Sequence, residues 1–204
     1  MLHRACVVLC AAALVVAMTH DAHATPPSTT STAKVALSGC LAAGDGYLRA
    51  RVRGALDLDL DWKDAQMQCE GAPRPSGNGV RVSIAGPLRG EGRRIRLVFG
   101  IAGVGEGESG KVLRTNVTLL FEGEQRIYAT LGDDKCTVDT LSQQRVETLG
   151  QSRAIYRVVV SGFCLGPAAN PTRTERVIVT SFDFAARVEF GDDDRHEKSP
   201  APKD

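Results

Sequence analysis

The sequence predicts an all-β protein: a single antiparallel β-sandwich or barrel-like domain with two disulfides that close hairpins. Three observations lead to this fold class. Apolar and polar residues alternate over much of residues 35–191, turn-forming residues interrupt the alternation at short intervals, and four cysteines flank two segments that resemble hairpins. Eight to ten short strands separated in this way are typical of a sandwich or barrel.

The alternation places the expected strands along the chain. The segment Tyr156–Val160 is apolar on both faces except for Arg157, as in a central strand. Residues Thr140–Leu149 are a weak helical candidate, yet the same residues also fit one arm of a hairpin that turns at Gly150. The remaining strands are expected near residues 48–52, 56–62, 80–84, 95–101, 117–121, 127–131 and 177–190.

The first hairpin can be registered from its charges. If residues 54–56 form a three-residue loop, one register brings opposite charges together on one face and apolar residues together on the other. This register aligns Arg49, Arg51 and Arg53 with Asp61, Asp59 and Asp57, and it aligns Leu48, Ala50 and Val52 with Trp62, Leu60 and Leu58.

The cysteines predict two disulfides. Cys40 and Cys69 flank the first hairpin, and Cys136 and Cys164 lie 14 residues to either side of Gly150. Four cysteines allow three pairings, and this symmetry favours 40 with 69 and 136 with 164. A zinc site built on four thiolates is the alternative, although the spacing contains no CxxC pair.

The first 24 residues predict an export signal. A positive start at Met1–Arg4 precedes an apolar run at Ala5–Met18, and Ala22-His23-Ala24 supplies the small residues that a signal peptidase requires. We expect cleavage after Ala24 and a periplasmic or secreted protein, with lipidation of Cys10 as an alternative. No second apolar run follows, so no transmembrane segment is expected.

The segments of the chain and its net charge limit the partners that can be expected. Residues 25–34 read as a flexible linker, residues 35–191 as the β domain and residues 192–204 as a disordered charged tail. Loss of Arg4 and Asp21 with the signal takes the basic count from 25 to 24 and the acidic count from 24 to 23, which keeps the net charge at +1. That balance indicates neither nucleic acid nor an anionic membrane as a partner.

Cleavage would also remove two of the six cysteines and three of the four histidines, so that of the histidines only His196 in the tail would remain. A Ser-His-Asp or Cys-His arrangement, or a histidine-ligated metal, is therefore not expected in the domain, and we predict no catalytic residue and no cofactor. A hydrolase that depends on two carboxylates remains an alternative.

Two motifs resemble ligand sites. Residues 105–111 have the glycine and lysine spacing of a phosphate-binding loop, but Val112 replaces the required hydroxyl and a strand is expected where a helix should begin. Asp57, Asp59 and Asp61 share one strand face and are a weak metal alternative, because one face cannot supply the six to eight oxygens that calcium needs. The acidic segment 132–135 is expected to be a turn.

A loop after Cys69 is the candidate binding segment. Residues 68–75 contain two prolines and predict a rigid turn held by the disulfide. Exposed loops on a rigid scaffold often carry function. The predicted binding loop comprises Ala72, Pro73, Arg74, Pro75, Ser76, Gly77 and Asn78.

The sequence thus favours an exported, non-catalytic binding or interaction domain of the bacterial cell envelope, with an envelope protein or small ligand as the partner. The alternatives are a carboxylate-dependent hydrolase of an envelope glycan and an inhibitor of a secreted enzyme. A pocket with two converging acids would favour the hydrolase. A flat surface on which the acids pair with arginines would favour the binding domain.

Overall fold

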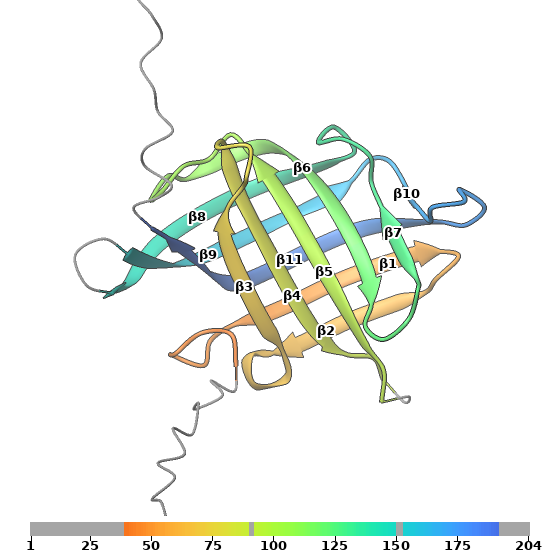
Figure 1. The fold of residues 1–204 in the computed structure, drawn as a ribbon, viewed down its shortest axis with the longest axis horizontal. Helices are drawn as coiled ribbons and strands as arrows, with labels where there is room; N and C mark the ends of the chain where they lie inside the picture. Colours follow the sequence, from red (N-terminus) through yellow and green to blue (C-terminus); the bar gives the residue numbers. More distant parts are fainter. Residues whose placement is uncertain (1–38, 90–91, 150–152, 192–204) are drawn as a thin grey trace, which may run out of the picture. The chain divides into compact units, whose positions relative to one another are not determined.

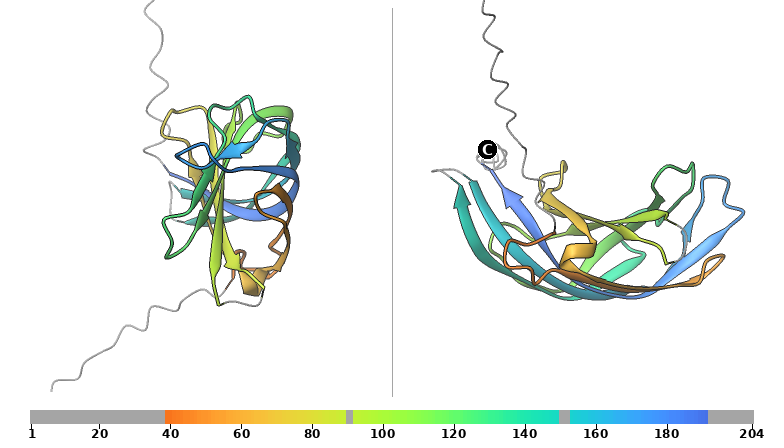
Figure 2. Two further views of the ribbon diagram at one scale, coloured as in Figure 1. Left: turned by 90° about the vertical axis from the view of Figure 1, so that its right-hand side faces the viewer. Right: turned by 90° about the horizontal axis from the view of Figure 1, so that it is seen from below.

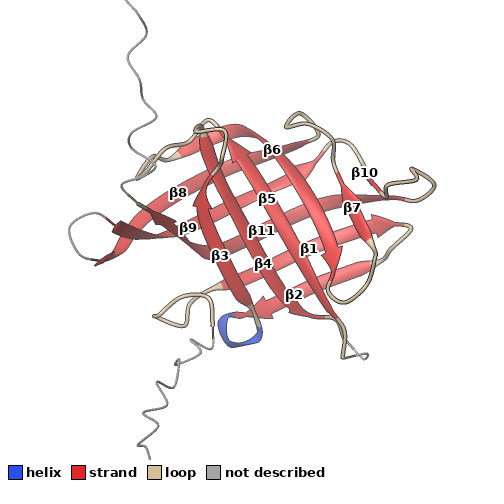
Figure 3. Cartoon of the chain, in the orientation of Figure 1, coloured by secondary structure: helices blue, strands red, loops and turns tan. Residues whose placement is uncertain are grey.

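The computed structural model describes residues 39–89, 92–149 and 153–191. The predicted signal sequence, linker and tail and the turn at Gly150 lie outside these ranges. Within them the chain forms one antiparallel sheet of eleven strands, without an α-helix (Figures 1 and 3). The predicted all-β fold is confirmed. In this part of the chain no helix is long and apolar enough to cross a membrane.

The strands alternate with short turns, and one 3-10 turn, η1, separates β2 from β3. The elements in chain order are β1 (Tyr47–Gly54), β2 (Leu58–Lys63), η1 (Asp64–Gln66), β3 (Gln68–Pro73), β4 (Gly79–Pro87), β5 (Arg94–Ala102), β6 (Gly110–Phe121), β7 (Ile127–Ala129), β8 (Cys136–Leu149), β9 (Arg153–Cys164), β10 (Ala168–Ala169) and β11 (Arg176–Phe190).

Two routes of hydrogen bonding connect the strands. Along the longer route the neighbours are β2, β1, β11, β9, β8, β6, β5, β4 and β3. The short strands β10 and β7 form a second connection between β11 and β6. Strands β11, β9, β8, β6, β7 and β10 therefore form a closed ring of pairings, and β1–β2 and β5–β4–β3 extend from it.

The sheet folds over itself into two layers. Figure 1 shows β3, β4, β5 and β6 crossing in front of β8, β9, β11, β1 and β2, and Figure 2 shows the same strands curving around a shared interior. Strand β3 passes very close to β11. A Cβ atom at Gly71 would lie only 2.3 Å from the carbonyl oxygen of Arg187, so glycine is required where these strands cross.

Aromatic side chains fill the space between the layers. The Phe99 ring of β5 lies 5.0 Å from the Phe182 ring and 4.7 Å from the Phe184 ring of β11, measured between centroids. All three rings are buried. The Trp62 ring packs against Gly86, and its indole N–H donates to the carbonyl of Pro87 over 3.0 Å. These contacts hold the two layers together through apolar burial.

The predicted register of the first hairpin is confirmed. In the β1–β2 pairing, Arg49 lies opposite Asp61 and Arg51 opposite Asp59. On the inner face, Leu48, Ala50 and Val52 lie opposite Trp62, Leu60 and Leu58, as expected.

The helical candidate at Thr140–Leu149 is wrong. These residues belong to β8, which pairs with β9 over its whole length and with the start of β6. Register shifts between Val138 and Thr140 and between Arg145 and Glu147 mark two bulges. Each bulge adds a residue and interrupts the alternation from which a strand is normally predicted.

The rigid turn predicted for residues 68–75 is also largely wrong. Gln68–Pro73 form the edge strand β3, which pairs with β4, so Ala72 and Pro73 of the predicted binding loop lie in a strand. Pro73 is tolerated because it ends an edge strand, where no further neighbour needs its missing N–H group. Only Arg74–Asn78 connect the two strands.

Both predicted disulfides are present. Cys40, before β1, is bonded to Cys69 of β3, with 5.0 Å between their Cα atoms. Cys136 and Cys164 are bonded to each other and lie directly opposite in the β8–β9 pairing. Disulfides are typical of proteins outside the reducing cytosol.

We predict that the double substitution Cys136→Ala and Cys164→Ala lowers the free energy of unfolding by about 3 to 4 kcal/mol, because the bond closes a loop of nearly 30 residues in the unfolded chain. Urea unfolding measures this change.

Peptide mapping without reduction should find Cys40 linked to Cys69 and Cys136 linked to Cys164. A free thiol at any of these four positions would contradict the two disulfides.

Candidate functional site

The outer face of β1, β2 and β11 carries a concentration of charge. Alternation along β1 turns Arg49, Arg51 and Arg53 outward while the intervening residues enter the core. The outward residues of β2 are Asp59, Asp61 and Lys63, and β11 adds Asp183 opposite Arg49. We call this surface the arginine–aspartate face; its members are Arg49, Arg51, Arg53, Asp57, Asp59, Asp61, Ser181 and Asp183.

The shortest ion pair on this face does not follow the register. Arg53 reaches diagonally to Asp59 at 2.7 Å and lies 4.0 Å from its direct partner Asp57. Arg49 lies between Asp61, at 3.8 Å, and Asp183, at 3.4 Å. Each of these exposed pairs contributes at most about 1 kcal/mol, so they align the side chains more than they stabilise the fold.

Among the described residues, the guanidinium of Arg51 has no carboxylate as an ion-pair partner. Its direct neighbour Asp59 turns to Arg53, and its neighbour on the other side, Ser181, is uncharged. Within the described residues, Arg51 forms no ion pair and its side chain no hydrogen bond. The predicted pairing of Arg51 with Asp59 therefore holds for the backbone register and fails for the side chains.

A bulge in β11 lies beside Arg51. Arg51 pairs with Ser181 and Val52 pairs with Val179, so Thr180 is an extra residue in β11. Both Thr180 and Ser181 are exposed. The bulge thus places two consecutive hydroxyl side chains beside an unpaired guanidinium; bulges are frequent next to functional sites.

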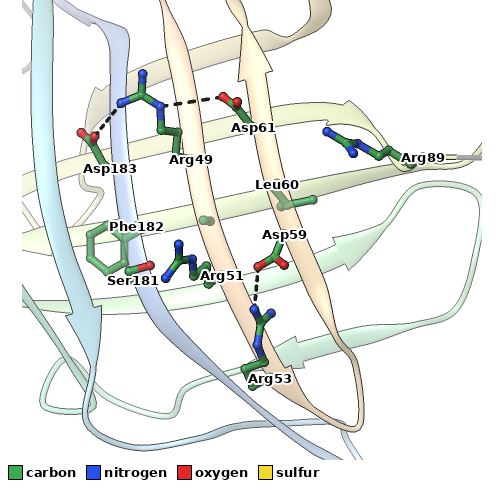
Figure 4. A pocket seen from close by; sticks show the side chains of 11 residues that line it. Arg49, Arg51, Arg53, Asp59, Leu60, Asp61, Arg89, Ser181, Phe182 and Asp183 are labelled. Carbon is green, nitrogen blue, oxygen red and sulfur yellow. Dashed lines mark hydrogen bonds and ion pairs between the residues drawn. The ribbon is translucent and has the colours of Figure 1, made fainter.

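An open depression of about 660 Å³ covers the middle of this face (Figure 4). Arg89, which follows β4, also lines it and so brings a cation from the other layer to the same place. Figure 4 marks ion pairs to Arg49 and Arg53 and none to Arg51 or Arg89. The lining residues are Arg49, Ala50, Arg51, Arg53, Asp59, Leu60, Asp61, Arg89, Ser181, Phe182 and Asp183.

A tyrosine extends the polar network at one end. The Tyr47 hydroxyl donates a hydrogen bond to Asp183 over 2.8 Å. Burial, together with this hydrogen bond, raises the pKa of Tyr47 above its usual value. The phenol therefore remains a neutral donor that fixes Asp183 beside Arg49.

The three aspartates considered as possible metal ligands form ion pairs with basic side chains. Asp57 and Asp59 lie against Arg53, and Asp61 lies near Arg49 and Lys63. No group of three potential metal ligands occurs in residues 39–89, 92–149 and 153–191. All three aspartates therefore take part in ion pairs with basic side chains.

The shortened binding loop is a tight turn. The Gly77 N–H donates to the carbonyl of Arg74 over 2.9 Å, and the Arg74 N–H donates to the carbonyl of Gly79 over 3.0 Å. Pro75, Ser76, Gly77 and Asn78 are exposed at its tip. No residue of this loop lines the depression. The loop and the arginine–aspartate face are therefore two separate candidate surfaces.

An ion pair anchors the loop to the neighbouring turn. The Arg74 guanidinium donates to both carboxylate oxygens of Asp133, at 2.9 and 3.2 Å, and the Asn116 side-chain amide donates to the same carboxylate. The hydrogen bond from Arg74 holds the pKa of Asp133 below its usual value. Residues 132–135 do form the expected turn, and its first aspartate anchors the loop.

The stretch that resembles a phosphate-binding loop does not form one. Residues 110 and 111 begin β6, so a strand follows the glycines where such a loop needs a helix N-terminus. Glu106 accepts hydrogen bonds from Arg145 and Tyr156, and the Gly105 carbonyl accepts one from Gln143. The segment is a connection packed on β8 and β9.

Every carboxylate that is at least partly buried in the described part of the chain has a partner. Asp64 accepts hydrogen bonds of 2.8 to 3.2 Å from the backbone N–H groups of Cys40, Leu41 and Gly46. The others are held by basic side chains: Glu106 by Arg145, Glu122 by Arg94 and Arg96, Asp133 by Arg74, Asp183 by Arg49, and Glu189 by Arg153 and Arg187.

Three residues of the candidate site were not indicated by the sequence. Arg89, Ser181 and Asp183 reach the depression from β11 and from the end of β4, which are far from β1 in the chain. The period-two pattern of residues 177–190 predicts a strand there, but it contains no signal for the strand's neighbour.

Comparison with known proteins assigns neither a family nor a function to the chain. No family model matches the chain, and no match was found among curated proteins or solved structures.

We predict that Asp133→Asn lowers the free energy of unfolding by about 1 to 3 kcal/mol at pH 7, because a charge-assisted bidentate contact is lost. Since the folded-state pKa of Asp133 is depressed, its stabilisation is present above the unfolded pKa of about 3.9 and is lost as the pH falls through the folded value. The stability difference from the wild-type protein should therefore shrink below about pH 4.

Urea unfolding at several pH values measures this difference. Asp139→Asn is the matched control, because Asp139 is exposed and contacts no cation in the described residues. It should change stability by less than about 0.5 kcal/mol. A difference for Asp133→Asn that is independent of pH would contradict the role of the ion pair.

Proposed function

We propose that this protein is an exported, non-catalytic binding domain of the bacterial cell envelope, acting in the periplasm or outside the cell, and that it binds its partner through the arginine–aspartate face. One observation carries the proposal: the carboxylates of this face are held by cations while Arg51 remains available at its centre. Such a surface is preorganised for recognition, because its charged side chains are already oriented.

The location in the envelope is supported by two features. The first 24 residues have the three parts of an export signal. Four cysteines outside that signal form two disulfides, which persist in oxidising compartments.

The hydrolase alternative is less well supported. A glycosidase needs one carboxylic acid with a raised pKa and a second carboxylate about 5 to 9.5 Å away, facing the same space. The depression contains Asp59, Asp61 and Asp183, and each of these lies within 4 Å of an arginine. An arginine in contact favours the ionised form and opposes the role of general acid.

The inhibitor alternative is favoured by a specific observation. The turn Arg74–Asn78 is exposed at its tip and is anchored by the bidentate contact of Arg74 with Asp133. A rigid exposed loop binds a cleft with little loss of conformational entropy. In this version the partner would be a secreted enzyme and the contact would centre on Pro75–Asn78.

Photocrosslinking in intact cells tests the proposal and separates the surfaces. A photoreactive amino acid is placed at Thr180, which is exposed beside Arg51, at Ser76 or at Arg81, an exposed residue of β4 that lies on neither surface. We expect a discrete crosslinked product from position 180 and none from position 81.

Other outcomes have defined consequences. A product from position 76 alone would contradict the proposed face and favour the inhibitor. No product from any position, combined with turnover of an envelope glycan by the purified protein, would contradict the binding role.

A further inference from the structure

We propose that the depression on the arginine–aspartate face is a binding site for a tetrahedral oxyanion, a phosphate or sulfate group, recognised by Arg51 and Ser181 with Arg89 at its rim. The inference rests on the proposed binding function and specifies the ligand class of that face.

Two arginines of the depression form no ion pair among the described residues. Its lining contains four arginines and three aspartates, an excess of one positive charge, and the aspartates Asp59, Asp61 and Asp183 lie within 4 Å of Arg53 or Arg49. Arg51 and Arg89 also belong to this surface, and neither makes an ion pair in the described part of the chain. An anion that enters the depression therefore meets unneutralised positive charge.

The donors around Arg51 suit an oxyanion. A guanidinium offers five N–H donors in a planar fork, which matches the oxygens of phosphate and sulfate. Ser181 lies opposite Arg51 in the β1–β11 pairing, and within the described residues its exposed hydroxyl has no hydrogen-bond partner. The bulge at Thr180 allows Ser181 to face outward while Phe182 stays in the core.

The arrangement favours a tetrahedral group over a carboxylate. One guanidinium can satisfy both oxygens of a carboxylate in a single plane. A phosphate or sulfate has further oxygens that point away from that plane, and Arg89 approaches from a different layer of the fold (Figure 4). With about 660 Å³ available, the depression also has room for the organic part of an ester.

NMR titration of the isotope-labelled protein tests this site. Inorganic phosphate is added at constant ionic strength while the backbone amide of Ser181 and the side-chain Nε–H of Arg51 are followed. We expect saturable shifts at both positions. Arg51→Gln should weaken binding about fivefold or more, because it removes the charge and the fork of donors while keeping a polar side chain.

The control is Arg81→Gln, which removes an exposed arginine from β4 outside the depression. It should leave the dissociation constant within about twofold of the wild-type value, since that arginine is outside contact range. Shifts that do not saturate, or an equal loss of affinity in both variants, would overturn the proposal. Acetate that binds as tightly as phosphate would overturn the preference for a tetrahedral ion.

A second titration with glycerol phosphate distinguishes the sources of the group. Tighter binding of the ester assigns the site to a phosphorylated ligand, and equal binding assigns it to the free ion; both support the site. Because these titrations use the purified protein, they can succeed even if crosslinking in cells fails, which separates the failure of this inference from the failure of the proposed function.

Discussion

The structure depends on strand β11, whose inner face packs in the core and whose outer face carries part of the candidate site. Phe182 and Phe184 of this strand contact Phe99 of the opposite layer, and the crossing of β3 over β11 is so close that residue 71 must be glycine. Strand β11 also pairs with β1, β9 and β10. The contact between its inward phenyl rings and β5 therefore sets where the other layer lies. The same alternation turns Ser181 and Asp183 outward, so the core and the candidate site are determined by one strand.

The part of this arrangement that could be predicted from the sequence is the part that local patterns specify. The register of the first hairpin followed because charge and hydrophobicity demanded the same alignment, and the disulfides followed from the symmetry of the cysteines. Strand β8 was less clear because its two bulges break the period of two. The two prolines Pro73 and Pro75 predicted a turn over residues 68–75, but Pro73 ends an edge strand, where it is acceptable, and Pro75 lies in the connection that follows. Arg89 lines the same depression as Arg51 because one layer folds over the other, which no local pattern encodes.

The function that we propose for this fold is recognition. Charged residues on the face of β1, β2 and β11 form ion pairs, and the diagonal contact of Arg53 with Asp59 leaves Arg51 without a carboxylate among the described residues. Had Arg53 paired only with Asp57, Asp59 would have remained available to Arg51 across the hairpin. The diagonal contact of 2.7 Å therefore leaves the Arg51 guanidinium available at the centre of this surface.

A double-mutant cycle on Phe99 and Phe182 tests the central claim most directly. The free energy of unfolding is measured for Phe99→Leu, Phe182→Leu and the double variant, all of which keep an apolar side chain in the core. If the rings couple the two layers as their 5.0 Å separation indicates, the interaction energy should be favourable by about 0.5 to 1.5 kcal/mol. Additive effects within about 0.3 kcal/mol would contradict the account, because β11 and β5 would then be stabilised independently of each other.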